Sequence, residues 1–208
     1  MTGRTFPDGF IWAAATAGHQ VEGDNTNSDT WFAENVEPTV FMQKSGRGCD
    51  SYARWAEDID LAAGLGLNAY RFSVEWARIE PEEGLFDEDE LDHYEAIVDR
   101  CRELGLAPVV TFNHFTSPHW FAARGSWLDP EAPALFARYC RVVAERFGPP
   151  GSVLCAIMKP RAATSMASGC RKPRSKLRST TERSMLVIFQ LFARLATDPK
   201  SDLVRLKA

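Results

Sequence analysis

Apolar residues follow two different spacings along the first 160 residues, and the two spacings alternate. Short apolar runs typical of buried strands are followed by longer segments in which apolar residues recur every three or four positions, as on one face of a helix. Segment 87–104 shows the helical spacing: Leu91, Tyr94 and Ile97 share one face, acidic residues open the segment and Gly105 ends it. The pattern predicts strands at 10–18, 69–76, 107–115 and 153–158, and helices at 50–64, 87–104 and 133–147.

Strand–helix alternation that is repeated three times and begun a fourth time predicts an α/β fold with a parallel sheet and helical crossovers. The nearly continuous apolar strands fit a sheet that is buried on both faces. Polar and aromatic residues gather where three strands end, as His19-Gln20, Glu75-Trp76 and Asn113-His114. In α/β barrels ligands bind at this face, so the three strand ends predict one shared pocket.

Charge divides the chain into two unlike parts. Residues 1–148 carry 12 Lys and Arg against 25 Asp and Glu, whereas residues 149–208 carry 12 against 3. We therefore expect one domain at 1–160 and a divergent basic tail at 161–208, with a possible helix at 185–197. Such a tail could contact phosphates, but no aromatic residues interleave with its charges, so we expect no nucleic-acid partner.

The cysteines and the apolar runs indicate the cellular compartment of the protein. The start of the chain lacks the apolar core of a secretory signal, and the apolar run 185–192 is far too short to span a membrane. The five cysteines are odd in number and form no C-x-x-C pair, which predicts reduced thiols in a cytoplasmic protein. Neither a zinc-type ligand spacing nor a cofactor motif is visible, so we expect no metal and no cofactor.

Three segments carry a resemblance to a known family. They are FPDGFIWAAATAGHQVEG (6–23), AYRFSVEWARIEPEEG (69–84) and VVTFNHFTSPHW (109–120), which lie in order and each at a predicted strand end. Together they resemble the N-terminal half of glycoside hydrolase family 1, the β-glucosidase family, over residues 6–148 or as far as 160. The resemblance implies a partial (β/α)8 TIM barrel of about four β/α units. The two exposed edges of such a half barrel predict a homo-oligomer, most simply a C2 dimer.

The same resemblance implies a saccharide pocket. Gln20 and His114 would hydrogen-bond sugar hydroxyls, and the rings of Phe115, Trp120 and Trp76 could cover the C–H faces of the sugar. A side-chain amide offers a donor and an acceptor together, and a neutral imidazole offers one of each, as pyranose hydroxyls require. Arg71 would support the family's nucleophilic carboxylate, or equally could be a structural ion-pair partner.

The two carboxyl groups that a retaining glycosidase needs find no match in the sequence. In the family the acid/base is the Glu of an Asn-Glu-Pro motif, and this chain has Met158-Lys159-Pro160 at that place. The family's nucleophile belongs to a Glu-Asn-Gly motif, which does not occur here. We therefore expect a truncated β-glucosidase-like glycoside hydrolase with a disabled site, which takes β-glucosides or related small saccharides. The alternative is a non-catalytic carbohydrate-binding or structural fragment.

The remaining candidates near the strand ends have structural interpretations. We expect Glu22 to brace its loop, and His93 to lie on the solvent face of its helix. Trp12, Trp55 and Trp127 are interpreted as packing residues. The four carboxylates after the second strand are expected to be solvated loop charges: Glu75, Glu80, Glu82 and Glu83.

The abrupt change in charge suggests that the tail arose from an altered reading frame or a recombined gene end. Reading the gene in its neighbouring frames tests this hypothesis, which fails if no family-like fifth strand appears in any of them.

Overall fold

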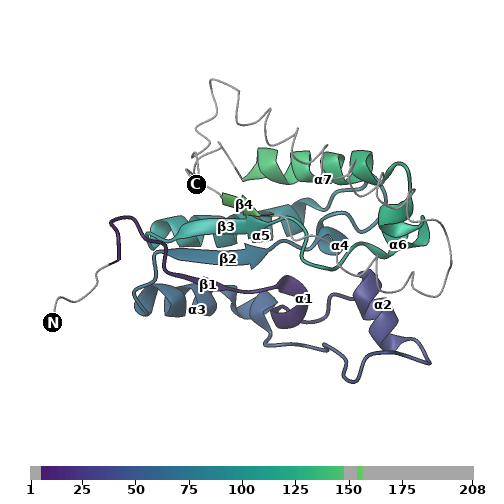
Figure 1. Cartoon of the computed structure of the whole chain (residues 1–208), viewed down its shortest axis with the longest axis horizontal. Coiled ribbons are helices and arrows are strands. Elements are labelled where there is room, and N and C mark those ends of the chain that lie inside the picture. The colour runs from purple at the N-terminus through teal and green to yellow at the C-terminus, as the bar shows by residue number, and fades with distance from the viewer. Residues whose placement is uncertain (1–5, 148–153, 157–208) are drawn as a thin grey trace.

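The computed structural model describes residues 6–147 and 154–156. Within them, four parallel strands form one sheet in the order β1-β2-β3-β4, and three long helices flank it (Figure 1). The α/β class with a parallel sheet, predicted from the alternation of spacings, is confirmed. The strands are β1 Ala13–Ala15, β2 Ala69–Ser73, β3 Ala107–Thr111 and β4 Leu154–Ala156, and the long helices are α3 Ser51–Gly64, α5 Glu88–Glu103 and α7 Ala132–Arg146.

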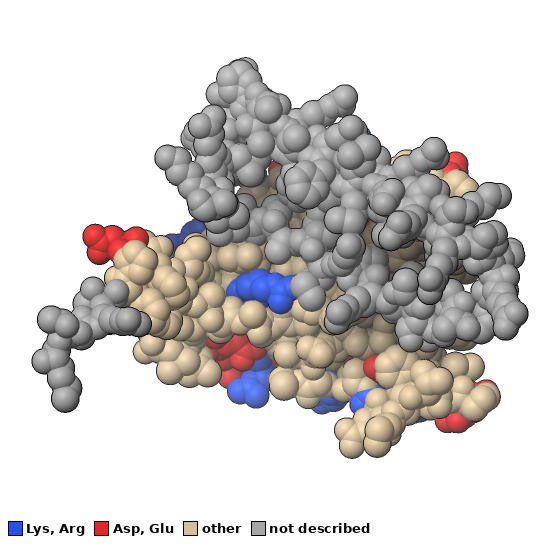
Figure 2. Space-filling model, in the orientation of Figure 1, with Lys and Arg blue, Asp and Glu red and all other residues tan. Residues whose placement is uncertain are grey.

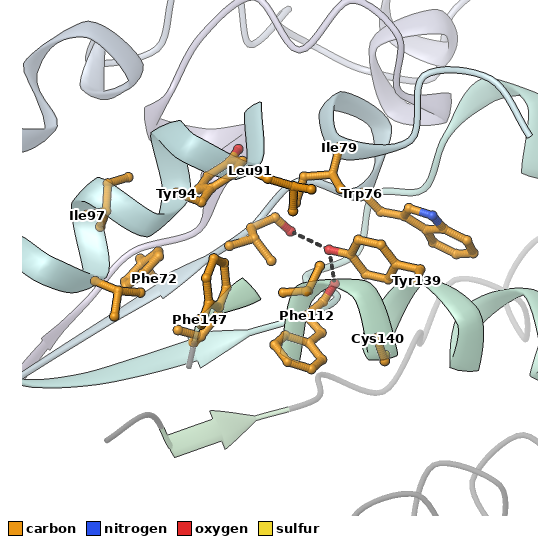
Figure 3. Close-up of a cluster of buried hydrophobic side chains, with 14 of the residues drawn as sticks. Phe72, Trp76, Ile79, Leu91, Tyr94, Ile97, Phe112, Tyr139, Cys140 and Phe147 are labelled. Atoms are coloured by element: carbon orange, nitrogen blue, oxygen red, sulfur yellow. Dashed lines mark hydrogen bonds between the residues drawn. The ribbon is translucent and has the colours of Figure 1, made fainter. Parts of the chain in front are cut away.

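Alternate residues of β2 and β3 face the helices. Tyr70 and Phe72 from β2, together with Val110 and Phe112 from β3 and the segment after it, join one apolar core with residues of all three long helices (Figure 3). Arg71, between Tyr70 and Phe72, belongs to the opposite face of the sheet, because successive side chains of a strand point to opposite sides. The helix residues of this core include Ile59, Leu91, Tyr94, Ile97, Val98, Phe136, Tyr139 and Val143.

The long helices begin and end close to the residues that their sequences predict. The carboxylate of Asp87 accepts hydrogen bonds from the backbone N–H of Asp89 (3.0 Å) and Glu90 (3.2 Å), which caps the start of α5. Gly105 follows α5 with φ +73°, a backbone conformation that a glycine adopts without steric cost. None of the helices in residues 6–147 combines the length and apolarity needed to cross a membrane.

Strands β1 to β3 are shorter than the sequence predicts. After β1 and β2 the chain soon turns into short helices that begin at Gly18 and Trp76, and after β3 it runs through a loop to a short helix that begins at His119. Segment 69–76 pairs only as far as Ser73, and Trp76 begins a helix rather than ending a strand. Likewise 10–18 pairs only over Ala13–Ala15, and 107–115 only over Ala107–Thr111. The short helices are α1 Gly18–Val21, α2 Asp29–Asn35, α4 Trp76–Ile79 and α6 His119–Ala123, followed by a 3-10 turn at Ser126–Leu128.

Several sequence-based predictions concern residues outside the described ranges. They are Lys159 at the acid/base position, the basic tail 161–208 and its helix at 185–197.

Candidate saccharide site

Arg71 and His114 meet at the carboxyl ends of β2 and β3. The Arg71 guanidinium donates from Nε to the Thr111 hydroxyl (2.9 Å) and from Nη2 to Nδ1 of His114 (2.9 Å). A guanidinium has no acceptor, so Nδ1 of His114 must accept, and Nε2 carries the hydrogen of the neutral ring. Burial and the adjacent Arg71 lower the pKa of His114, which keeps the ring neutral. The pair therefore presents a fixed tautomer whose Nε2–H is a hydrogen-bond donor.

Gln20 is exposed on the short helix α1, between residues that are held in place. Nε2 of His19, on one side, lies 3.0 Å from the Glu34 carboxylate. Burial opposes ionisation of Glu34, but hydrogen bonds from Ser45 and His19 outweigh it and lower its pKa. On the other side, Glu22 is 7% exposed and accepts from Nε of Arg78 at 3.1 Å. The expectation that Glu22 braces this loop therefore agrees with its contacts.

Glu75 differs from the prediction of a solvated loop charge. It is 1% exposed, and its carboxylate accepts hydrogen bonds from Asn25 (2.8 Å), Thr116 (2.5 Å) and Ser73 (3.2 Å). The hydroxyl of Ser73 in turn accepts from the backbone N–H of Gly18 at 2.7 Å. Glu75 thus ties the segments that follow β1, β2 and β3 to one another, and it is a structural anchor of this end of the sheet.

Glu80 is also buried, again contrary to the prediction. Its carboxylate pairs with Arg138, accepts from Nε1 of Trp76 at 2.7 Å and accepts from the backbone N–H of Gly84 at 2.8 Å. Its backbone carbonyl accepts from Nε1 of Trp120 at 2.8 Å. Glu82 and Glu83 are exposed as predicted, and Glu83 pairs with an arginine.

The three candidate aromatic residues lie in different environments. Trp76 is 1% exposed and stacks on Tyr139 at a centroid distance of 5.0 Å, inside the core (Figure 3), so the prediction that its ring could face a sugar is wrong. Trp120 is half-buried and packs edge-on against Trp76. Phe115 is 49% exposed, has φ +75° and lies with its ring centroid 4.8 Å from that of His114. Phe115 is therefore the most accessible of the three.

His93 does not lie on a solvent-facing surface. Its ring is half-buried, stacks on Tyr52 at a centroid distance of 4.1 Å, and has its pKa lowered to about 4 by burial and by Arg78. Trp55 and Trp127 pack against the core as predicted, whereas Trp12 is 46% exposed and packs with Phe6 and Phe10. In the described part of the chain, no three His, Cys, Asp or Glu side chains are arranged to hold a metal ion.

Sequence reasoning missed the polar partners that hold the site together. Asn25, Ser73 and Thr116 are buried, and each donates to Glu75 from a different segment. Ser73 is the last residue of β2, and Asn25 and Thr116 lie in the segments that follow β1 and β3, so their only signal in the sequence is a position at or beyond the end of a strand. That signal does not show which of the neighbouring carboxylates they reach.

The sequence is similar to that of known glycosidases over most of its length. The family described as Glycosyl hydrolase family 1 matches residues 2–165. Beta-glucosidase A of Thermotoga maritima is 39% identical over 155 residues, which cover 71% of this chain and 35% of that protein. The human cytosolic beta-glucosidase is 36% identical over 152 residues, which cover 69% of this chain and 32% of that protein.

Solved structures agree with this assignment. The family 1 β-glucosidase of Thermotoga maritima superposes with a TM-score of 0.83 at 30% identity, over 98% of this chain and 48% of that one. A β-glycosidase from Pyrococcus horikoshii superposes with a TM-score of 0.79 at 32% identity, over 91% of this chain and 46% of that one. The chain thus spans about a third of the length of these curated relatives and about half of these solved structures, and its sheet is part of a TIM barrel. The chain belongs to glycosyl hydrolase family 1.

Proposed function

We propose that the chain forms the saccharide-binding side of a family 1 β-glucosidase pocket, and that the 208-residue polypeptide binds β-glucosides without cleaving them. The observation that carries the proposal is the bond from Arg71 to Nδ1 of His114, which makes Nε2–H the donor of a neutral ring. Gln20 is exposed at the same end of the sheet, on a turn whose neighbours are all anchored. The T. maritima relative has been solved in complex with castanospermine and with glucoimidazole.

The described carboxylates support binding without hydrolysis. Retaining hydrolysis needs one carboxyl as acid/base and one as nucleophile, about 5–5.5 Å apart. Glu22, Glu34, Glu75 and Glu80 are the buried glutamates in the described part of the chain, and each accepts hydrogen bonds from protein groups. The resemblance places Lys159 at the acid/base position, and a lysine ammonium, with a reference pKa of about 10.4, is a poor proton donor at neutral pH.

Titration with methyl β-D-glucoside, a neutral probe, tests the proposal. We expect binding to the full 208-residue chain in a ¹⁵N NMR titration, and a loss of affinity of about tenfold or more in Gln20→Ala and in His114→Ala, because each removes hydrogen bonds to the sugar hydroxyls. Gln43→Ala, at an exposed position of the loop between α2 and α3, is the control and should bind like the parent. Absence of binding by the parent chain would refute the proposal.

A chromogenic β-glucoside assay on the same protein distinguishes binding from catalysis. We expect no release of the chromophore above background. Turnover that disappears in Gln20→Ala and His114→Ala would instead identify a β-glucosidase whose nucleophile comes from a residue not recognised in this sequence.

We also propose that the half barrel self-associates through its β1 edge. Among the described strands, β1 pairs only with β2, and next to it Phe6, Phe10 and Trp12 form an exposed cluster with ring centroids 4.6–4.8 Å apart. Figure 2 shows that uncharged atoms predominate on the described part of one face of the molecule. An open strand edge beside an apolar cluster can pair with a second copy, and two half barrels can approximate a closed one.

Sedimentation tests this self-association. At micromolar concentration we expect a species of twice the mass of the chain. Phe10→Ser should weaken the dimer by about tenfold or more, because Phe10 is 40% exposed in the monomer and lies beside the edge. Leu61→Ser, at a 64% exposed position on α3, should not affect it. A compact monomer at these concentrations would contradict the proposal.

Finally, we propose a cytoplasmic location. Cys49 and Cys101 are free thiols, and burial raises the pKa of Cys101 to about 12, which keeps that thiol protonated and unreactive.

A further inference from the structure

The turn that carries Gln20 is held at three places. The backbone N–H of Gly18, at its start, donates to the Ser73 hydroxyl at 2.7 Å. The backbone carbonyl of Val21, at its end, accepts from the N–H of Cys49 at 3.0 Å. The third hold is the side chain of Glu22, which reaches from the end of α1 into the protein interior. Because α1 has only four residues, its own hydrogen bonds contribute little, and these external contacts set its position.

Glu22 anchors the turn through contacts with two other side chains. The Tyr94 hydroxyl lies 3.1 Å from each of its two carboxyl oxygens, and Nε of Arg78 lies 3.1 Å from Oε2. Nη2 of Arg78 donates to the carbonyl of the next residue, Gly23, at 2.6 Å. Tyr94 comes from α5 and Arg78 from α4. Glu22 therefore fastens the Gln20 turn to two helices that belong to the rigid core.

The Gln20 turn also lies directly against two carboxyl groups. A Cβ atom added at Gly18 would lie 2.5 Å from Oε1 of Glu75 and 3.0 Å from Oε1 of Glu22. A cavity of about 20 Å³ adjoins this place, with Gly18, Glu22, Ser73 and His93 among the residues that line it. That volume is enough for about one water molecule, so the turn has limited room to move when its contacts change.

We infer that Glu22 is a positioning residue for saccharide binding: its neutral carboxyl fixes the turn that presents Gln20, and its ionisation loosens that turn. The inference rests on the proposed role of Gln20 as a sugar contact, and it goes beyond that role by linking Gln20 to a buried group that touches no ligand.

The charges around Glu22 give the direction of the pH effect. Glu75 faces it from the end of β2, Arg78 from α4, Tyr94, Glu90 and His93 from α5, and Tyr52 from α3. Burial and the Glu75 carboxylate raise the pKa of Glu22 to about 8, against the opposing effects of Arg78 and Tyr94. Burial lowers the pKa of His93 to about 4 and raises the pKa of Tyr52 to about 12, so both pKa values lie outside the range from pH 6 to 9. We therefore expect the turn to be fixed at pH 6 and looser at pH 9.

The experiment compares Glu22→Gln with the full 208-residue parent. Glutamine keeps the shape of the neutral acid but does not ionise, so it removes the titration and keeps the packing. We expect the affinity of the parent for methyl β-D-glucoside to fall at least fivefold between pH 6 and pH 9, whereas that of Glu22→Gln changes less than twofold. Glu82→Gln, at an exposed loop position, is the matched control and should follow the parent.

A second readout does not depend on saccharide binding. The side-chain NH₂ signals of Gln20, identified by their loss in Gln20→Ala, should shift with pH in the parent and stay constant in Glu22→Gln. If these signals behave so while no saccharide binds, the positioning link stands and the proposed function fails. If saccharide binds but neither its affinity nor the Gln20 signals respond to the Glu22→Gln change, the inference is overturned.

Discussion

Trp76→Ala is expected to lower the free energy of unfolding by about 3–5 kcal/mol. The indole is 1% exposed and contacts Tyr139, Phe121 and Phe136, with ring centroids 4.7–5.4 Å apart. Alanine would leave a cavity in the core and would remove the N–H that Glu80 accepts at 2.7 Å, so a buried carboxylate would lose one of its donors. Urea denaturation followed by circular dichroism measures the change.

Trp12→Ala is the matched control for this prediction. The Trp12 ring is 46% exposed, packs with Phe6 and Phe10 and does not belong to the apolar core, so its removal should cost no more than about 1 kcal/mol. An unchanged stability in Trp76→Ala, together with weaker saccharide binding, would place the Trp76 ring in the pocket and would contradict its position in the core.

The regular elements could be predicted because each is encoded by a local pattern. The apolar spacing of 87–104, its acidic start and the terminal Gly105 determine a helix without reference to any other segment, and the structure has α5 at Glu88–Glu103. The apolar runs at 69–76 and 107–115 likewise predict neighbouring strands. The predicted carboxyl end of 69–76 lies beyond that of β2, because Trp76 has the side chain of a strand residue while its backbone already belongs to α4.

The burial of Glu75 and Glu80 could not be predicted, because several of their partners are remote in the sequence. Glu75 accepts from Asn25 and Thr116, 50 and 41 positions away, and Glu80 pairs with Arg138, 58 positions away. A local pattern shows only a cluster of acids after a strand, which in most proteins is solvated. Only the packing of the strands and helices against one another brings these remote donors to the two carboxylates.

The saccharide site, too, could be predicted only in part from the sequence. The positions of Gln20 and His114 at strand ends were visible in the sequence, but the bond between Arg71 and His114 was not. The sequence left Arg71 equally open as an ion-pair partner, and the structure instead pairs it with the Thr111 hydroxyl and with an imidazole. Burial and the cation beside it lower the pKa of the His114 ring, so Arg71 helps to fix the protonation state of its neighbour.

The free energy of unfolding should depend on pH, because two buried carboxyl groups lie close together at this end of the sheet. A Cβ atom added at Gly18 would lie 2.5 Å from Oε1 of Glu75 and 3.0 Å from Oε1 of Glu22, so the two carboxyl groups are close to each other. Two like charges so close together in the protein interior repel each other strongly. The arrangement is tolerated while one of the pair is neutral. This end of the barrel should therefore be more stable in mildly acidic solution than in mildly alkaline solution.

Replacement of Glu22 by glutamine should remove that pH dependence. The unfolded chain releases the Glu22 proton near pH 4.5, whereas burial and Glu75 raise the pKa of Glu22 in the folded chain to about 8. Between these values the folded state binds more protons than the unfolded state, so stability falls as pH rises from about 4.5 to about 8 and levels off above that. The stability difference between Glu22→Gln and the parent should widen across this range, by a total on the order of 5 kcal/mol. Urea midpoints at pH 5 and pH 8.5 measure the widening, with Glu82→Gln as the control; a difference that stays constant between the two values would show that Glu22 is already ionised in the folded protein.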